Sequence, residues 1–266
     1  MDTTKPEFYS KNRSFQHDLG VEVLQYHMRW EEGDTVLDAG CGTGEICKYI
    51  SQQPGVASVV GVDVSPDFVR YASQHNSSPD VLYQVSDITD ASTIKPELRG
   101  AFSKVVSLQV LHWVQDKVTA LKVLHSCLKP GGEMLLWFNT NASKFCRILL
   151  GMASHPKWQI YLTDFELNVF PWPSSDIVKD RHSSLLLEEC GFEVLSCDLK
   201  EHLHPFNSKK QFRNAVGACL GHLCYIPQDK HEEFLNDVEK MTRDINFVSD
   251  NYKVTNECQV VYARKL

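Results

Sequence analysis

The amino-acid sequence predicts an α/β fold built on a doubly wound, mostly parallel sheet. One observation is a series of short apolar runs separated by helical patterns, which is typical of alternating strands and helices. The second is a glycine-rich turn at residues 40–44, which follows the first run and opens a helix. Together they indicate a sheet covered by helices on both faces. The predicted strands are residues 35–39, 58–62, 81–85, 104–108 and 133–138.

Specific residues mark the helix boundaries in this region. Ser65 can cap a helix whose first position is Pro66, where a missing backbone N–H has no intrahelical partner to lose. The Lys-Pro-Gly-Gly stretch at 129–132 is expected to end a helix before the strand at 133–138. These signals place one helix between the second and third strands and another between the fourth and fifth.

The pattern changes after Asn139. Residues 142–172 carry aromatic and aliphatic side chains without strand alternation, and we expect a helical cap over the carboxyl edge of the sheet. A helix at about 174–190 and a strand from 192 to about 202 are expected next. Two helical stretches then lead to a final strand that ends near residue 264.

Composition excludes several classes of function. With a formal charge of -7, the 266-residue chain lacks the basic clusters that bind nucleic acid. No segment approaches the roughly 20 apolar residues of a membrane span, and residues 1–13 contain no apolar signal core, so we expect a soluble, cytoplasmic protein. Nine cysteines without a C-x-x-C pair predict reduced thiols. His202 and His204 have no third ligand at a recognisable spacing, so no metal site is expected.

The glycine-rich turn has the features of a nucleoside-cofactor site. Asp38 lies in the first strand, and Gly40, Gly42 and Gly44 alternate in the turn. Asp63 ends the second strand about 20 residues later, where a carboxylate can hold both ribose hydroxyls of a ligand at the sheet's switch point. A nicotinamide dehydrogenase shares this layout but prefers G-x-G-x-x-G, and here the third glycine comes one position early.

With Asp87 and Ile88 after the third strand, this motif resembles the class I S-adenosylmethionine-dependent methyltransferases. The resemblance implies a Rossmann-like sheet with an antiparallel last strand, and S-adenosyl-L-methionine as the cofactor. It places Gly40 and Gly42 against the methionine part, Asp63 at the ribose, and Asp87 with Ile88 at the adenine. Close packing of a glycine turn is the alternative interpretation, and Ile88 can equally be a core residue. The expected cofactor-binding residues are Tyr9, Asp38, Gly40, Cys41, Gly42, Asp63, Val64, Asp87, Ile88 and Leu108.

Two further stretches, residues 9–16 and 111–114, are similar to the juvenile hormone acid O-methyltransferase family of arthropods, and the similarity extends over essentially the whole chain. It implies that Gln16 and Trp113 hold the acceptor carboxylate, with His112 as a further candidate donor. The glutamine amide and the indole N–H are neutral donors that can each reach one carboxylate oxygen. The alternatives are a surface position for Gln16, a core aromatic for Trp113 and a structural role for His112.

The cap is expected to line an apolar tunnel for the acceptor, although residues at helical spacing also serve as core. Gln109 departs from the family, whose members commonly carry aromatics just before the Leu-His-Trp motif, and it lies near the expected point of methyl transfer. The expected pocket residues are Gln109, Leu149, Trp158, Leu162, Phe165 and Phe170.

The sequence therefore predicts a single methyltransferase domain that esterifies an apolar acid. Its parts are a helical lid at 1–30, a cofactor-binding core at 34–139, a cap insertion at 140–173 and an α/β completion with further cap helices at 174–266. The favoured acceptor is a sesquiterpenoid, farnesoic acid or juvenile hormone acid. The alternatives are a methyltransferase with an unrelated acceptor and a binding protein without turnover. A homo-oligomer is compatible with the sequence but not indicated by it.

Overall fold

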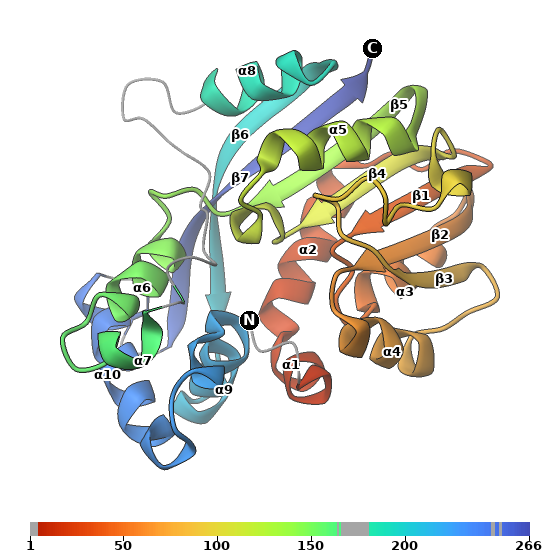
Figure 1. Cartoon of the computed structure of the whole chain (residues 1–266). Helices are drawn as coiled ribbons and strands as arrows, with labels where there is room; N and C mark the ends of the chain where they lie inside the picture. Colours follow the sequence, from red (N-terminus) through yellow and green to blue (C-terminus); the bar gives the residue numbers. More distant parts are fainter. Residues whose placement is uncertain (1–4, 164, 166–180, 246–247, 250–251) are drawn as a thin grey trace.

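A seven-stranded sheet organises the chain (Figure 1). The structure, a computed structural model, describes residues 5–163, 165, 181–245, 248–249 and 252–266. The strands are β1 (Asp34–Ala39), β2 (Val56–Asp63), β3 (Val81–Val85), β4 (Phe102–Leu108), β5 (Leu128–Phe138), β6 (Phe192–Pro205) and β7 (Lys253–Lys265). Their order is β3-β2-β1-β4-β5-β7-β6, and β7 runs antiparallel to both β5 and β6, whereas the other neighbouring strands are parallel. The predicted doubly wound, mostly parallel sheet with an antiparallel last strand is confirmed.

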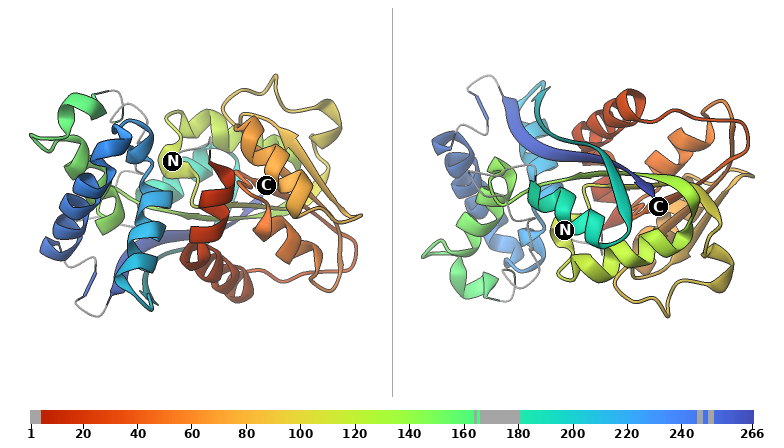
Figure 2. Two further views of the ribbon diagram at one scale, coloured as in Figure 1. Left: turned by 90° about the horizontal axis from the view of Figure 1, so that it is seen from below. Right: turned by 90° about the horizontal axis from the view of Figure 1, so that it is seen from above.

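Helices connect the strands and cover both faces of the sheet (Figure 2). The α-helices are α1 (Pro6–Asn12), α2 (Ser14–His27), α3 (Glu45–Ser51), α4 (Pro66–His75), α5 (Lys117–Cys127), α6 (Lys144–Ala153), α7 (Gln159–Leu162), α8 (Arg181–Glu189), α9 (Lys209–Leu220) and α10 (His231–Asp244). Short 3-10 turns are η1 (Pro96–Leu98), η2 (Leu111–Trp113), η4 (His222–Cys224) and η5 (Gln228–Lys230). Helices α2 and α3 pack on one face, and α5 and α8 pack on the other.

Alternation along the strands distributes apolar side chains between these two layers. In β1, Val36 packs with Leu24 of α2 and Ile50 of α3. Its neighbour Leu37 belongs to the opposite cluster, together with Leu121 of α5. Consecutive residues of a strand point to opposite faces, so a strand covered on both sides must be apolar throughout. This is the reason why continuous apolar runs identify the central strands.

The predicted boundaries agree with the structure at some points and differ at others. The hydroxyl oxygen of Ser65 accepts a hydrogen bond from the backbone N–H of Phe68, so α4 begins where its capping signal indicates. The fifth strand begins at Leu128, earlier than the predicted residue 133. Leu128 leaves α5 and pairs at once with Phe102, and a register shift then absorbs the proline and glycines that follow.

A helical cap lies beyond the carboxyl ends of the central strands (Figure 1). Strands β6 and β7 pair from Phe192 and Lys265 to Pro205 and Lys253, well past the point where β5 ends. Their far ends pack with α6, α9 and α10, so the cap combines the expected insertion with helices from the last third of the chain. Residues 164 and 166–180, which contain the expected start of a helix at 174, lie outside the described residues.

The two amino-terminal helices are tied to the turn after β1 by polar contacts. The guanidinium of Arg13 donates to the Glu45 carboxylate at 2.7 Å and to the Thr43 hydroxyl at 3.3 Å. Ser10 of α1 donates to the other carboxylate oxygen of Glu45. Because Arg13 is buried, its charged guanidinium needs the Glu45 carboxylate to offset the loss of hydration. The pair attaches the segment expected to form a lid directly to the predicted cofactor turn.

All nine cysteines belong to the described part of the chain, and none of them forms a disulfide. None of the described helices combines the length and the apolar character needed to cross a membrane.

Removal of the Glu45 charge tests the attachment of the amino-terminal helices. Glu45→Gln leaves Arg13 buried beside a neutral amide, and we expect the free energy of unfolding in urea to fall by about 3 kcal/mol. The matched control is Glu7→Gln, which breaks an exposed pair with Lys11 on α1. This control should leave the free energy of unfolding almost unchanged, because exposed ion pairs contribute little to stability. Equal losses in the two variants would contradict the role assigned to the buried pair.

Candidate active site

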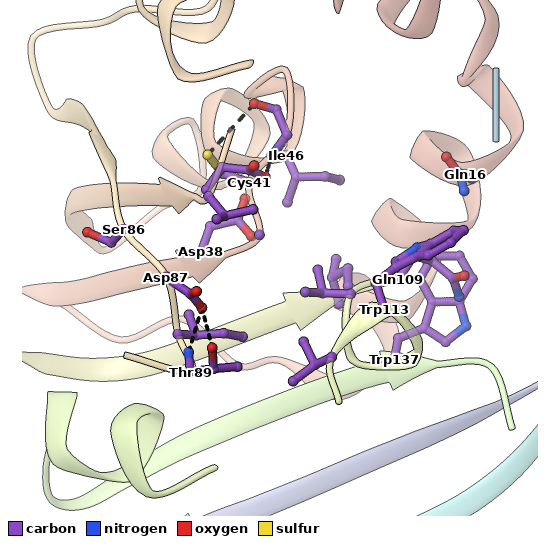
Figure 3. Close-up of a pocket in the computed structure, with 18 of the residues that line it drawn as sticks. Gln16, Asp38, Cys41, Ile46, Ser86, Asp87, Thr89, Gln109, Trp113 and Trp137 are labelled. Carbon is purple, nitrogen blue, oxygen red and sulfur yellow. Dashed lines mark hydrogen bonds between the residues drawn. The ribbon is translucent and has the colours of Figure 1, made fainter. Parts of the chain in front are cut away.

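A cavity of about 580 Å³ lies at the carboxyl ends of β1, β2 and β4 (Figure 3). Its volume falls in the range of about 300–1,000 Å³ that is typical of small-molecule sites. Every residue of the expected cofactor set borders it, as do four of the expected acceptor and pocket residues, Gln16, Gln109, Trp113 and Phe165. Segments that are far apart in the sequence therefore meet around one cavity.

The turn after β1 needs glycine for two reasons. Gly40 has a φ of 82° and Gly42 a φ of 55°, in the left-handed region that other residues rarely adopt. A Cβ at Gly40 would also collide with the side chain of Val110. The backbone N–H groups of Gly40 and Cys41 both donate to the Val62 carbonyl, at 2.7 and 2.9 Å, which holds the turn against the end of β2.

Two carboxyl groups border the cavity at the ends of β1 and β2, the buried Asp38 and the half-buried Asp63. Burial raises the pKa of Asp38 to about 6, although the Cys47 thiol donates to it at 3.1 Å and partly opposes the shift. Burial also raises the pKa of Asp63, which accepts backbone hydrogen bonds from Gly42 and Ser65, each at 2.9 Å. Asp63 thus connects the glycine turn to the start of α4.

The segment that follows the third strand contributes another part of the cavity wall. Asp87 follows β3 and accepts hydrogen bonds from the backbone N–H and the hydroxyl of Thr89, at 2.8 and 2.7 Å. Ile88 is buried and borders the cavity between these residues, so it serves as both core and wall. In Figure 3 the side chains of Asp38, Ser86 and Asp87 gather on one side of the cavity.

The neutral side chains of Gln16 and Trp113 lie on the other side (Figure 3). The hydroxyl of Tyr9 donates to the amide oxygen of Gln16 at 2.9 Å. Burial raises the pKa of Tyr9, so this hydroxyl keeps its proton, and its ring stacks on Phe68 with 5.3 Å between centroids. Since the oxygen of Gln16 is engaged, its NH2 group remains as the donor, and Figure 3 shows the amide nitrogen on the side of Trp113.

His112 does not border this cavity, contrary to its expected place among the acceptor donors. It is buried against Trp113 and the edge of the Phe145 ring, and its Nδ1 lies 3.5 Å from the backbone nitrogen of Asn139. Burial lowers its pKa to about 3, so the ring is neutral at physiological pH. The structure gives His112 a packing role.

Three of the expected pocket residues lie in the interior of the cap instead. Leu149, Trp158 and Leu162 are buried in its hydrophobic cluster, because the apolar faces of the cap helices pack on one another. The indole of Trp158 donates to the Asp237 carboxylate at 2.9 Å, away from the cavity. Phe165 does border the cavity, and Phe170 lies outside the described residues.

Several residues that border the cavity were not among the expected ones. Ser86 and Thr89 flank Asp87, and Trp137 lies near the end of β5, so the rule that ligands meet strand ends could have found them. Tyr225 comes from the cap, far away in the sequence, and no local signal marks it. The set includes Arg13, Gly20, Ile46, Ser86, Thr89, Val110, Trp137 and Tyr225.

Comparison with known proteins agrees with this geometry. A family model described as a methyltransferase domain matches residues 37–136. Juvenile hormone acid O-methyltransferase of Drosophila melanogaster is 28% identical, covering 96% of this chain and 89% of the relative. The Bombyx mori protein of the same name is 25% identical, covering 98% and 97%. The structure of Haemonchus contortus phosphoethanolamine N-methyltransferase 2 in complex with S-adenosyl-L-methionine has a TM-score of 0.58 at 15% identity, covering 93% of this chain and 52% of that chain.

The domain match spans the strands and turns that carry Asp38, Asp63 and Asp87, which form the acidic half of the cavity. The two curated relatives extend the similarity to the amino-terminal helices and the cap. Residues 37–136 therefore resemble a methyltransferase domain, the fold is shared with the matched methyltransferase structure, and over nearly its whole length the chain is similar to juvenile hormone acid O-methyltransferases.

Proposed function

We propose that this protein transfers the methyl group of S-adenosylmethionine to the carboxylate of an apolar acid, and that sesquiterpenoid acids such as farnesoic acid are its acceptors. The observation that carries the proposal is the hydrogen bond from Tyr9 to the oxygen of Gln16. It leaves Gln16 as a hydrogen-bond donor beside Trp113, in the cavity that the cofactor residues also border. The names of the two curated relatives support an acid as the acceptor.

The acidic half of the cavity fits the cofactor. A buried carboxyl such as Asp38 is stabilised in its ionised form by a cation beside it, and the ammonium of the methionine part is such a cation. Asp63 has its carboxylate at the carboxyl end of β2, where it can accept from ribose hydroxyls, and Asp87 and Ile88 border the cavity where they can contact the adenine. When bound, S-adenosylmethionine supplies an electrophilic methyl group on a sulfonium.

The donor residues suit a carboxylate because they are neutral. A carboxylic acid with a pKa near 4.3 is ionised at neutral pH, so its oxygen is nucleophilic without a general base. Methyl transfer cancels the charges of carboxylate and sulfonium, so hydrogen bonds to the carboxylate weaken as the reaction proceeds. Strong ionic contacts would therefore stabilise the bound acid more than the transition state. Gln16 and Trp113 can orient the carboxylate without neutralising it.

Positioning and exclusion of water then provide the rate. Phe165, Trp137 and Tyr225 border the cavity with aromatic surface from β5 and the cap. Such walls hold an apolar chain and keep the reacting oxygen close to the methyl group. The cavity thus combines an acidic cofactor half, a neutral donor set and an apolar wall, which together match methyl ester formation.

Incubation with methyl-labelled cofactor and a panel of terpenoid, fatty and aromatic acids tests the function directly. We expect a labelled methyl ester from a sesquiterpenoid acid, identified by mass spectrometry, and no product from the corresponding alcohol. Label in an amine or a hydroxyl compound would indicate a different acceptor class. Binding of S-adenosylhomocysteine without an ester from any acid would identify a binding protein.

Substitution of the two donors tests the acceptor site. Gln16→Ala and Trp113→Phe should each lower kcat/KM for the acid at least about tenfold, since each loses a hydrogen bond to a charged group. Calorimetry should show unchanged affinity for S-adenosylhomocysteine. Gln52→Ala is the control, because Gln52 is exposed at the end of α3, at the opposite edge of the sheet. Full activity in both donor variants would refute the assignment.

The raised pKa of Asp38 predicts a pH dependence of cofactor binding. Below pH 6 the carboxyl is mostly protonated, and it must lose its proton to pair with the ligand's ammonium. The affinity for S-adenosylhomocysteine should therefore rise by up to about tenfold per pH unit up to pH 6 and level off above it. Asp38→Asn should bind more weakly above pH 6, with a flatter profile. A profile of the unaltered protein that is flat from pH 5 to 7 would contradict this role.

A further inference from the structure

Gln109, the first residue after β4, has an unusual backbone. Its φ of 62° lies in the left-handed region, where it is joined among the described non-glycine residues only by Tyr252. Such a conformation requires support from its surroundings and is often found at functional sites. Here the backbone N–H of Gln109 donates to the Trp137 carbonyl at 2.6 Å. The side chain is thereby directed to the border of the main cavity and of a small neighbouring one that Gln16 also borders.

A chain of three amides determines which end of the Gln109 side chain can donate. The backbone N–H of Phe145 donates to Asn256 Oδ1 at 3.1 Å, Asn256 Nδ2 donates to Asn139 Oδ1 at 2.8 Å, and Asn139 Nδ2 donates to Gln109 Oε1 at 2.7 Å. A backbone N–H can only donate, so it assigns the oxygen of the first amide. Each amide then assigns the orientation of the next one. Asn139 and Asn256 are buried, so these bonds do not compete with water.

The NH2 group of Gln109 is consequently left as a donor. Its nitrogen lies 3.7 Å from the Sγ of Cys258, a weak acceptor that can engage one of the two N–H bonds. Burial raises the pKa of Cys258 to about 12, so this sulfur is an uncharged thiol. The second N–H bond remains for a ligand in the cavity.

We propose that Gln109 donates a hydrogen bond to the acceptor carboxylate next to Gln16, and that Asn139 and Asn256 are positioning residues that keep its NH2 group turned to the substrate. This inference rests on the proposed function. In both glutamines the amide oxygen is taken by a protein donor, Tyr9 in one case and Asn139 in the other. The site thus presents donors from both amides, which fits a group that only accepts. A hydroxyl or amine acceptor would leave its own hydrogens opposite these donors.

The nearly isosteric variant Gln109→Met removes the donor and keeps the side-chain length. With S-adenosylhomocysteine bound, calorimetry should show farnesoic acid binding at least about tenfold more weakly, as expected for loss of a hydrogen bond to a charged group. The affinity for the corresponding alcohol should change less than about twofold, and that for S-adenosylhomocysteine should be unchanged. In kinetics the KM for the acid should rise with little change in kcat, because the bond stabilises the bound acid at least as much as the transition state. Gln52→Met is the matched control.

A double-mutant cycle tests the amide chain itself. Asn256→Ala should weaken acid binding in the unaltered protein but have no further effect in the Gln109→Met background, because Asn256 acts through Gln109. Asn256 does not border the main cavity, so a direct contact with the reacting group does not explain such coupling. Additive effects would overturn the positioning role.

The outcomes separate this inference from the proposed function. If the unaltered protein neither binds nor esterifies any acid of the panel, the proposed function fails. If it esterifies an acid and Gln109→Met binds that acid as tightly, only the role of Gln109 is refuted. Equal losses for acid and alcohol would also refute it, since they would indicate a contribution of shape alone.

Discussion

The ion pair between Arg13 and Glu45 connects the side of the cavity with the proposed acceptor donor Gln16 to the turn that borders the proposed cofactor site. No residue of helix α1 is fully buried, so apolar packing contributes little to its docking beyond the stacking of Tyr9 on Phe68. The pair holds the amino-terminal segment on the turn after β1, and with it Tyr9 and Gln16. A buried ion pair is weak evidence for stability, because desolvation offsets much of the attraction. Its main effect here is to fix the position of helices α1 and α2 relative to Glu45, the first residue of α3.

The two halves of the cavity differ in their electrostatics. The buried carboxyl group of Asp38 lies near the end of β1 and the half-buried one of Asp63 ends β2, whereas the amide of Gln16 and the indole of Trp113 lie on the other side. This division agrees with the proposed reaction, which brings a cationic cofactor to an anionic acceptor and cancels both charges. Carboxylates would repel the acid, and a guanidinium or ammonium would stabilise the acid more than the transition state. Gln16 and Trp113 are neutral donors and avoid both problems, and the guanidinium of Arg13, which also borders the cavity, is paired with Glu45.

The cofactor half was the more predictable one. Its residues lie at the ends of consecutive parallel strands, where the chain direction alone brings them to one edge of the sheet. The cap was less predictable, because helical spacing identifies an apolar face without saying what covers that face. Leu149, Trp158 and Leu162 therefore lie in the cap interior, and Phe165 borders the cavity. His112 shows the same limit, since its motif is local and its buried position depends on Asn139 and Phe145.

Local sequence was sufficient for the strands, the glycine turn and the acidic residues, because strand periodicity, positive φ and strand ends are properties of short segments. The orientation of the amides follows only from the folded chain. Gln16 depends on a tyrosine seven residues away, and Gln109 depends on Asn139 and on Asn256 in the final strand. Which end of an amide faces a ligand is decided by the groups that bind the other end. For Gln109 these groups come from segments that meet only when β7 pairs with β5.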